Sequence, residues 1–506
     1  MDVINIIYGC IYRIPYDIHL TLESEAKDDL NQMRILLIAM PDTADYIDNI
    51  TRQPNLALVS LAGNLPGHDV RVLDLVVHKP HLRQPIADIL KTFRPQIVGL
   101  SAMSFQFDTL LRVSRYIRSL DQQIVMIAGG YHATLMARDE SAVHWTDMLD
   151  FIVRGEGEET FGELVAAIEK NGHAYDGIPG LSYRRGSRWI HNDERPLLDL
   201  TKINLPLRTA RLSQNFFFGT WSLDVAETSR GCPFHCKFCS IMHMYGSVFR
   251  PFPIERVIAD LQNIRARGTR AVFFSDDNIT YDIAHFQAIC DAIIGNGLND
   301  MIYLTQVTAV GLADNPDLVA KMEKANFKVA FVGFESMEPS ALKEMKKPTS
   351  PEKNRRAAQL LRRHHIAIIA GCVVGYPDDD WESVSRQYRM IKDLQPDSIY
   401  AQFLTPYPQT RVREELQAES LITNNDFSRY DGFTCNIRTR HLTEQELFRC
   451  LKSLTLRKVF DPKMIFINAF WKMFPLRYIL TNSMKCVLDN CYNVLSAKQK
   501  IKHMDL

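Results

Sequence analysis

Three cysteines, Cys232, Cys236 and Cys239, lie close together in the segment "RGCPFHCKFCS" (230–240) of a chain that has ten cysteines. Thiols at this spacing could bind zinc, hold an iron–sulfur cluster or form a disulfide. A closed zinc site needs a fourth ligand, which His243 would supply in a Cys₃His arrangement. Sulfur-rich ligation with one position left open fits a [4Fe–4S] cluster that is held through three of its irons.

The residues around the cysteines favour a loop that wraps a compact object. Gly231 and Pro233 flank the first cysteine and permit tight turns of the backbone. Phe238, between the last two cysteines, would shield the bound group from water.

The elements around this loop alternate between strand and helix. Helices are expected at about 254–267, 282–296, 316–325, 351–365 and 381–394, which predicts six β/α units in a full or partial barrel. The cysteine loop follows the first strand, where such folds place their chemistry. The expected strands are 222–228, 270–277, 301–309, 328–336, 367–376 and 398–407.

The N-terminal half shows a second alternation of this kind. Its strands are apolar throughout, which predicts a parallel sheet that is buried on both faces in a doubly wound, flavodoxin-like domain. The expected strands are 34–40, 69–75, 97–103, 124–130 and 151–157, with helices at 55–65, 85–93, 108–120 and 159–170. The domain prediction is a leader at 1–32, this domain at 33–172, a linker with a small hairpin at 173–221, the barrel at 222–410 and a mainly helical region at 411–506.

The cysteine loop resembles the C-x3-C-x-aromatic-C signature of radical S-adenosylmethionine (SAM) enzymes. The resemblance implies a [4Fe–4S] cluster on Cys232, Cys236 and Cys239, with SAM bound to the open iron and cleaved to a 5′-deoxyadenosyl radical. "TPYPQT" (405–410) resembles a P-x-P-G-T segment of the family, with Gln409 in place of the glycine.

Three further segments match the family in order, each at the end of an expected strand. "SDDN" would hold the methionine amino group, and Glu335 of "VGFES" would bond the ribose or the amino group. Gly333 would let the protein backbone approach SAM, and "GCVVGYP" would pack against adenine. The residues that the resemblance assigns to SAM are Phe238, Asp276, Asp277, Asn278, Gly333, Glu335, Ser336 and Gly371. Taken singly, each has a plain structural alternative, such as a helix cap or a turn glycine.

The N-terminal half resembles the cobalamin (B12)-binding domain found upstream of many radical SAM modules. The matching pieces are "PNLALVSLAGNLPGHDVRVLD" (54–74), "GGYHAT" (129–134) and "RGEGEETFGEL" (154–164). The D-x-H-x-x-G histidine of cobalamin carriers is missing, and His132 is expected to be structural or to contact the cobalamin tail. The alternative is a β/α module that has lost its cofactor. The residues expected to contact cobalamin are Ser101, Ser104, Gly129, Gly130, His132, Gly155 and Glu156.

Together the two resemblances imply an enzyme that abstracts hydrogen from an unreactive carbon and then transfers a methyl group from methylcobalamin. Oxidative cyclisation and ring rearrangement are the alternatives. An RNA-modifying enzyme is disfavoured because 59 Lys and Arg balance 59 Asp and Glu. A cobalamin sensor is disfavoured because it has no need of a cluster with an open iron.

The remaining cysteines have no paired spacing and indicate reduced thiols in a cytoplasmic protein. The sequence predicts no signal peptide and no membrane span. Expected partners are a small-molecule or lipid-like substrate and a reducing partner such as flavodoxin or ferredoxin. The aromatic stretch at 460–480 either touches a membrane surface or packs against the barrel.

Overall fold

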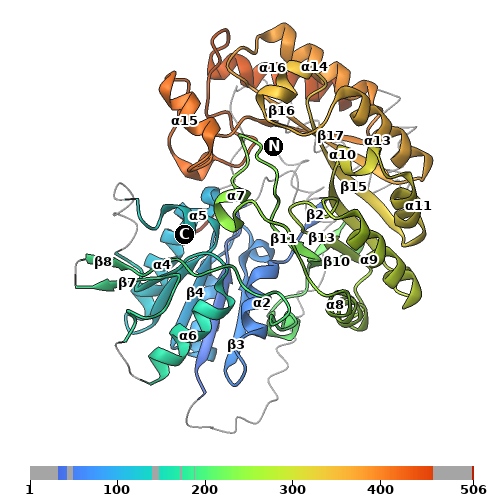
Figure 1. Ribbon diagram of the computed structural model, residues 1–506. Helices are drawn as coiled ribbons and strands as arrows, with labels where there is room; N and C mark the ends of the chain where they lie inside the picture. The colour runs from blue at the N-terminus through green and yellow to red at the C-terminus, as the bar shows by residue number, and fades with distance from the viewer. Residues whose placement is uncertain (1–31, 43–49, 140–146, 171–173, 187, 460–503) are drawn as a thin grey trace, which may run out of the picture. The chain divides into compact units, whose positions relative to one another are not determined.

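The first sheet belongs to the N-terminal half and has the strand order β3-β1-β4-β5-β6-β7-β8 (Figure 1). The computed structural model describes residues 32–42, 50–139, 147–170, 174–186, 188–459 and 504–506. The first five strands in this order are parallel and form a doubly wound sheet, as predicted. They are β1 (Arg34–Ala39), β3 (Asp69–Asp74), β4 (Ile97–Ser101), β5 (Val125–Gly129) and β6 (Phe151–Val153).

Helices bury both faces of this sheet, which explains why its strands are apolar throughout. Ile86 and Leu110 belong to the core on one face, and Val59 and Leu164 belong to the core on the other. The helices are α2 (Leu56–Gly63), α3 (Arg83–Phe93), α4 (Phe107–Leu120), α5 (Tyr131–Met136) and α6 (Gly157–Glu169).

The predicted hairpin consists of β7 (Leu181–Arg185) and β8 (Arg188–His191). It is not a free part of the linker, because β7 pairs antiparallel with β6 and so extends the first sheet. This pairing satisfies the backbone groups of β6, which would otherwise be an open edge.

The second sheet contains six parallel strands in chain order, which form a partial barrel as predicted. They are β10 (Trp221–Ala226), β13 (Ala271–Phe274), β14 (Ile302–Thr308), β15 (Phe327–Glu335), β16 (Ala367–Val374) and β17 (Ser398–Phe403). The helices that follow them are α8 (Ile254–Ala266), α9 (Ile283–Gly295), α10 (Ala309–Ala313), α11 (Pro316–Lys324), α12 (Pro339–Glu344), α13 (Pro351–Arg363) and α14 (Trp381–Asp393).

One edge of the second sheet is completed from the N-terminal half of the chain. Beyond β10 lies the short antiparallel strand β9 (Phe217–Phe218), which pairs with β2 (Thr51–Arg52). The two halves of the chain therefore share a sheet.

The linker after the hairpin is bonded to both halves. The amide of Leu207 donates to the Val59 carbonyl of α2, and the amide of Leu212 donates to the Val72 carbonyl of β3. The fully buried Arg208 bonds Asp224 on β10 and Asp260 on α8. This segment therefore fixes the first domain to the barrel.

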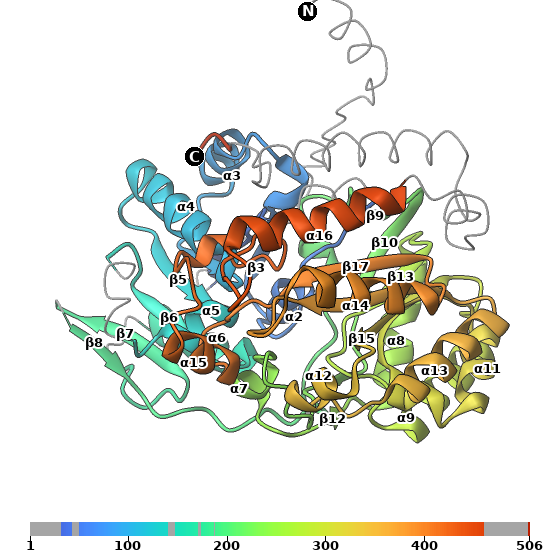
Figure 2. The same ribbon diagram turned by 90° about the horizontal axis from the view of Figure 1, so that it is seen from above.

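The C-terminal region contains α15 (Arg411–Ala418), the 3₁₀ helix η6 (Phe427–Arg429) and α16 (Glu444–Val459). Helix α16 lies beside α14 (Figure 2). The predicted leader and the aromatic stretch at 460–480 lie outside the described residues. No helix in the described ranges is both long and apolar enough to span a membrane.

Candidate functional site

The cysteine loop begins directly after β10 and is held by two aspartates that follow β13. The Asp276 carboxylate accepts hydrogen bonds from the Thr228 amide at 3.1 Å, the Thr228 hydroxyl at 2.7 Å and the Ser229 hydroxyl at 2.5 Å. Asp277 accepts the Gly231 amide at 2.8 Å. Burial raises the pKa of Asp276 to about 7 and that of Asp277 to about 6.

These bonds differ from the roles that the resemblance implied. Asp276 is 1% exposed, and its oxygens are engaged by the start of the loop. We therefore assign Asp276 to holding the loop, and its contact with the methionine end of SAM stays a prediction. Asn278, the last member of the segment, points its amide nitrogen at the Cys232 sulfur, 3.6 Å away.

All three cysteines of the loop are free thiols. Gly231 has a φ of +87°, and a Cβ at this position would collide with the Val248 carbonyl, so the turn requires glycine. Burial raises the pKa of Cys232, Cys236 and Cys239, the last to about 12. Cys232 and Cys236 also raise the pKa of Cys239, so the three sulfurs lie near one another.

Thiols in this state fit a metal cluster, because bound iron supplies the positive charge that stabilises buried thiolates. Within the described residues, no three His, Cys, Asp or Glu side chains lie close enough to hold a single metal ion between them. The Cys₃His zinc site with His243 is therefore not formed in the described part of the chain.

A buried ion pair lies beside the cysteines. The Lys347 ammonium is 2.9 Å from Glu335 Oε1 and 6.0 Å from the centre of the Phe238 ring. Burial alone would lower the pKa of Lys347, but Glu335 and then Cys236 raise it above its ordinary value. A Cβ on Gly333 would lie 2.6 Å from Glu335 Oε1, so Gly333 leaves the room that this pair occupies.

The other two residues predicted at SAM have structural contacts. The Ser336 hydroxyl donates to Gln387 Oε1 at 2.8 Å and accepts the Glu338 amide. Gly371 faces the Phe331 ring, which would lie 3.1 Å from an added Cβ. Both positions shape the ends of β15 and β16.

The residues predicted at cobalamin gather at the carboxyl edge of the first sheet. Gly130 has a φ of +88°, and a Cβ there would lie 2.9 Å from the Ser101 hydroxyl, so glycine lets α5 start close to β4. Gly155 has a φ of +72°, and a Cβ there would meet no atom within 4 Å. A Cβ on Gly129 would lie in ordinary contact with the Val153 carbonyl, at 3.5 Å. Ser104 is buried at the start of a 3₁₀ turn.

His132 is packed between the domains. Its ring lies 4.3 Å from the Phe107 ring and 5.4 Å from the Phe427 ring, centre to centre. Burial lowers the pKa of His132 to about 4, which makes the ring neutral, and its Nδ1 has no hydrogen-bond partner in the part of the chain that the structure describes. Packing between the Phe107 and Phe427 rings accounts for the position of this histidine.

Glu156 lies at the contact between the two domains and not at the open edge. Together with Glu158 it forms a buried ion network with Arg230, which immediately precedes the cysteine loop. Arg230 is 2.9 Å from Glu156 and 2.7 Å from Glu158, and Arg250 is 2.9 Å from Glu156. Ser60 donates to Glu158 at 2.8 Å. We call Glu156, Glu158, Arg230 and Arg250 the interdomain ion network.

Sequence reasoning missed Arg230, Glu158, Arg250 and Lys347. Charged residues inside apolar β/α segments are the signal that could have marked them, because such residues are buried only when paired. Their partners could not be found in this way, since the members of the Arg230–Glu158 pair are 72 positions apart.

Family models match both halves of the chain. Residues 226–390 match the radical SAM superfamily, and residues 50–165 match the B12 binding domain. This chain belongs to the B12-binding radical SAM enzymes. Members of this family use a [4Fe–4S] cluster and SAM, and their B12-binding domain carries cobalamin.

Known proteins resemble the enzyme over most of its length. An uncharacterised methyltransferase of Pyrococcus horikoshii is 29% identical over 87% of this chain and 95% of its own. An anaerobic magnesium-protoporphyrin IX monomethyl ester cyclase of Synechocystis is 24% identical over 87% of each chain. The solved structure of the cobalamin-dependent SAM radical enzyme OxsB has a TM-score of 0.68 at 17% identity, over 92% of this chain and 72% of that one, and so shares the fold.

The residues of the enzyme fit these cofactors. Three clustered thiols form a donor set for the cluster, and the glycines at 129 and 155 leave an open edge on the first sheet for a large ligand.

We expect Lys347→Met to lower the midpoint potential of the cluster, because a buried positive charge stabilises the reduced, more negative state. An EPR-monitored redox titration of the reconstituted enzyme measures this. Lys346→Met is the matched control, since Lys346 is exposed and its charge is screened by water. Equal potentials in the wild type and Lys347→Met would refute a charge effect of Lys347 on the cluster.

Proposed function

We propose that the enzyme is a C-methyltransferase that acts on an unreactive carbon of a small molecule. When bound, the cluster supplies the electron that cleaves SAM, and cobalamin supplies the methyl group. Cys232, Cys236 and Cys239 would hold the cluster, and the Lys347–Glu335 pair would lie beside bound SAM. The open edge at Gly129 and Gly155 would receive cobalamin.

The interdomain ion network is the observation that carries this proposal. Methyl transfer to a carbon radical requires the methyl donor and the radical to be held within reach of one substrate atom. Glu156 and Glu158 come from the B12-binding domain, whereas Arg230 is two residues from Cys232. A buried network at this place keeps the two cofactor sites in a fixed relation, which a two-cofactor reaction needs.

Incubation with methyl-labelled SAM under anaerobic conditions tests the proposal. The reconstituted enzyme, a reductant and extracts of small molecules and lipids are combined, and label in new products is followed by mass spectrometry. We expect 5′-deoxyadenosine together with a product that carries the labelled methyl group. An oxidised or cyclised product without label would instead support the second candidate, an oxidative cyclase, which the similarity to the Synechocystis cyclase favours.

Cys232→Ala is the matched negative control for that assay. It removes one of three cluster ligands, so we expect loss of the visible absorption of the cluster and of 5′-deoxyadenosine formation. The first domain, which does not contain Cys232, should stay folded and keep its cobalamin. Iron content and SAM cleavage equal to those of the wild type would show that the assignment of the cysteines is wrong.

The reaction also needs an external electron source. We propose a flavodoxin or a ferredoxin for this role, because both deliver single electrons at low potential. Membrane-surface contact through residues 460–480 stays a prediction from the sequence, since that stretch lies outside the described residues.

A further inference from the structure

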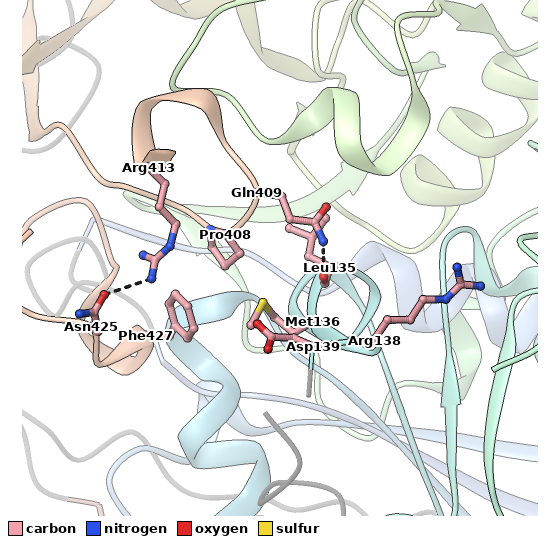
Figure 3. Close-up of a pocket in the computed structure, with 9 residues that line it drawn as sticks. All are labelled: Leu135, Met136, Arg138, Asp139, Pro408, Gln409, Arg413, Asn425 and Phe427. Atoms are coloured by element: carbon pink, nitrogen blue, oxygen red, sulfur yellow. Dashed lines mark hydrogen bonds between the residues drawn. The ribbon is translucent and has the colours of Figure 1, made fainter. Parts of the chain in front are cut away.

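A pocket of about 440 Å³ lies between α5 of the B12-binding domain and the loop that follows β17 (Figure 3). Apolar side chains form much of its wall: Leu135, Met136, Pro408 and Phe427. Its polar lining residues are Arg138, Asp139, Gln409, Arg413 and Asn425. A concave site with an apolar wall and a few placed polar groups has the character of a small-molecule site.

The walls of this pocket are the elements that contact the cysteine loop. Helix α5 lies against α7 (Ile241–Tyr245), which directly follows the loop. Helix α7 begins two residues after Cys239, so its contact with α5 brings one wall of the pocket next to the cysteine loop.

The opposite wall of the pocket, formed by the residues after β17, also contacts the cysteine loop. The Val412 amide donates to the Lys237 carbonyl inside the cysteine loop. Gln409 takes a φ of +62°, the conformation for which a glycine would be preferred, and its side-chain amide donates to the Leu135 carbonyl. This bond ties the loop after β17 to α5 and closes one side of the pocket.

Arg413 is the charged group that is held rigidly at this pocket. Its guanidinium donates to the Pro406 carbonyl at 3.0 Å, the Tyr430 hydroxyl at 3.2 Å and Asn425 Oδ1 at 3.1 Å. It also lies 5.1 Å from the centre of the Phe427 ring. All these acceptors are uncharged, so within the described residues none of its hydrogen bonds goes to a carboxylate.

Besides Arg413, the charged residues that line the pocket are Arg138 and Asp139. Arg138 extends away from the pocket and pairs with Glu194 at 3.1 Å (Figure 3). Arg411, two residues before Arg413, pairs with Glu415 at 3.1 Å. Arg413 is therefore the cation at this pocket that is positioned to receive an anionic ligand.

We propose that the pocket binds an amphipathic carboxylate, which is the substrate of the methyl transfer. Arg413 pairs with the carboxylate through its Nε–H and the second Nη2–H, because its other donors bond Pro406, Tyr430 and Asn425. Leu135, Met136, Pro408 and Phe427 line the apolar part of the pocket. This inference rests on the proposed function, because it takes the pocket between the two cofactor domains as the place where the substrate is held.

Equilibrium dialysis of the holoenzyme with radiolabelled decanoate and with 1-decanol tests the pocket. The two probes share a chain and differ in the charge of the head group. We expect Arg413→Met to weaken decanoate binding about tenfold or more and to leave decanol binding unchanged, because it removes a charge-assisted pair. Arg413→Gln, which keeps an amide donor, should lose the same preference, and Arg411→Met should behave as the wild type.

Cobalt and iron contents of every variant identify the occupant. If Arg413→Met and Arg413→Gln lose cobalamin, the pocket belongs to that cofactor and the proposal is overturned. Equal decanoate binding in wild type and in both variants overturns it as well. Formation of 5′-deoxyadenosine without any added probe is measured in parallel. If the wild type forms no 5′-deoxyadenosine, the proposed function is refuted. The decanoate result then concerns ligand binding to the pocket only.

Discussion

Arg230→Met is expected to lower the free energy of unfolding by about 3–5 kcal/mol, because it leaves buried carboxylates without their partner. Glu158 loses its ion pair, and Glu156 keeps only Arg250. Burial would raise the pKa of Glu158, but Arg230 and Ser60 hold it below its ordinary value in the folded wild type. Denaturant unfolding measures the loss. Arg265→Met is the matched control, since its partner Asp300 is half-exposed and such pairs contribute at most about 1 kcal/mol.

The same network predicts an effect on the relation between the cofactors. Glu158→Gln removes one charge of the network and leaves the Arg230–Glu156 pair in place, so cluster and cobalamin contents should be those of the wild type. The magnetic interaction between the reduced cluster and Co(II) cobalamin in EPR spectra should weaken, because the domains lose a fixed contact. 5′-Deoxyadenosine should then form in excess over methylated product. An unchanged EPR spectrum and an unchanged ratio of 5′-deoxyadenosine to methylated product would show that the network is not needed for positioning.

Arg208→Met should have an effect of similar size on stability. Arg208 is fully buried and bonds both Asp224 and Asp260. Asp224 keeps its pair with Arg211 at 2.8 Å, but Asp260 has no second ion-pair partner among the described residues. The loss of one member of such a pair costs about 3–5 kcal/mol, and the double variant Arg208→Met/Asp260→Leu should recover most of it because no buried charge is left without a partner.

The free energy of unfolding of Arg208→Met should also depend on pH. Burial raises the pKa of Asp260, and in the wild type Arg208 counteracts part of that rise. Without Arg208 the folded-state pKa rises further above the unfolded value, so the folded state binds the proton more tightly. The stability of Arg208→Met should therefore increase as the pH falls through that raised pKa, while the double variant shows no such change. Parallel pH profiles for the two variants would contradict an unpaired Asp260.

The elements were predictable from the sequence because each has a local cause. The strands of both sheets are apolar runs between helical patterns, and the structure places them within a few residues of the expected bounds. The position of the cysteine loop after β10 followed from the rule that β/α folds place their chemistry at the carboxyl ends of strands. The short helices α5 and α7 were not expected, since six and five residues carry too little periodicity.

The contacts between side chains were less predictable, for a physical reason. A carboxylate after a strand can bind a ligand or the neighbouring loop, and the sequence around Asp276 is the same in either case. Asp276 faces Thr228 and Ser229, which lie 48 and 47 positions away. Glu156 likewise matched a family motif, yet its partners are arginines of the barrel. The motifs predicted where residues gather, whereas the roles depend on pairs that only the fold brings together.

The pairing of β2 with β9 decides how this protein can be divided. Thr51 and Arg52 belong to the N-terminal half by sequence, but they form the outer edge of the second sheet. A barrel expressed from residue 222 onward would lack both β2 and β9, and the exposed edge of β10 would be open to pairing between molecules. Chimaeras that exchange the cobalamin module with a relative must therefore carry a compatible segment at residues 50–52, or they will yield aggregated protein however well each module folds alone.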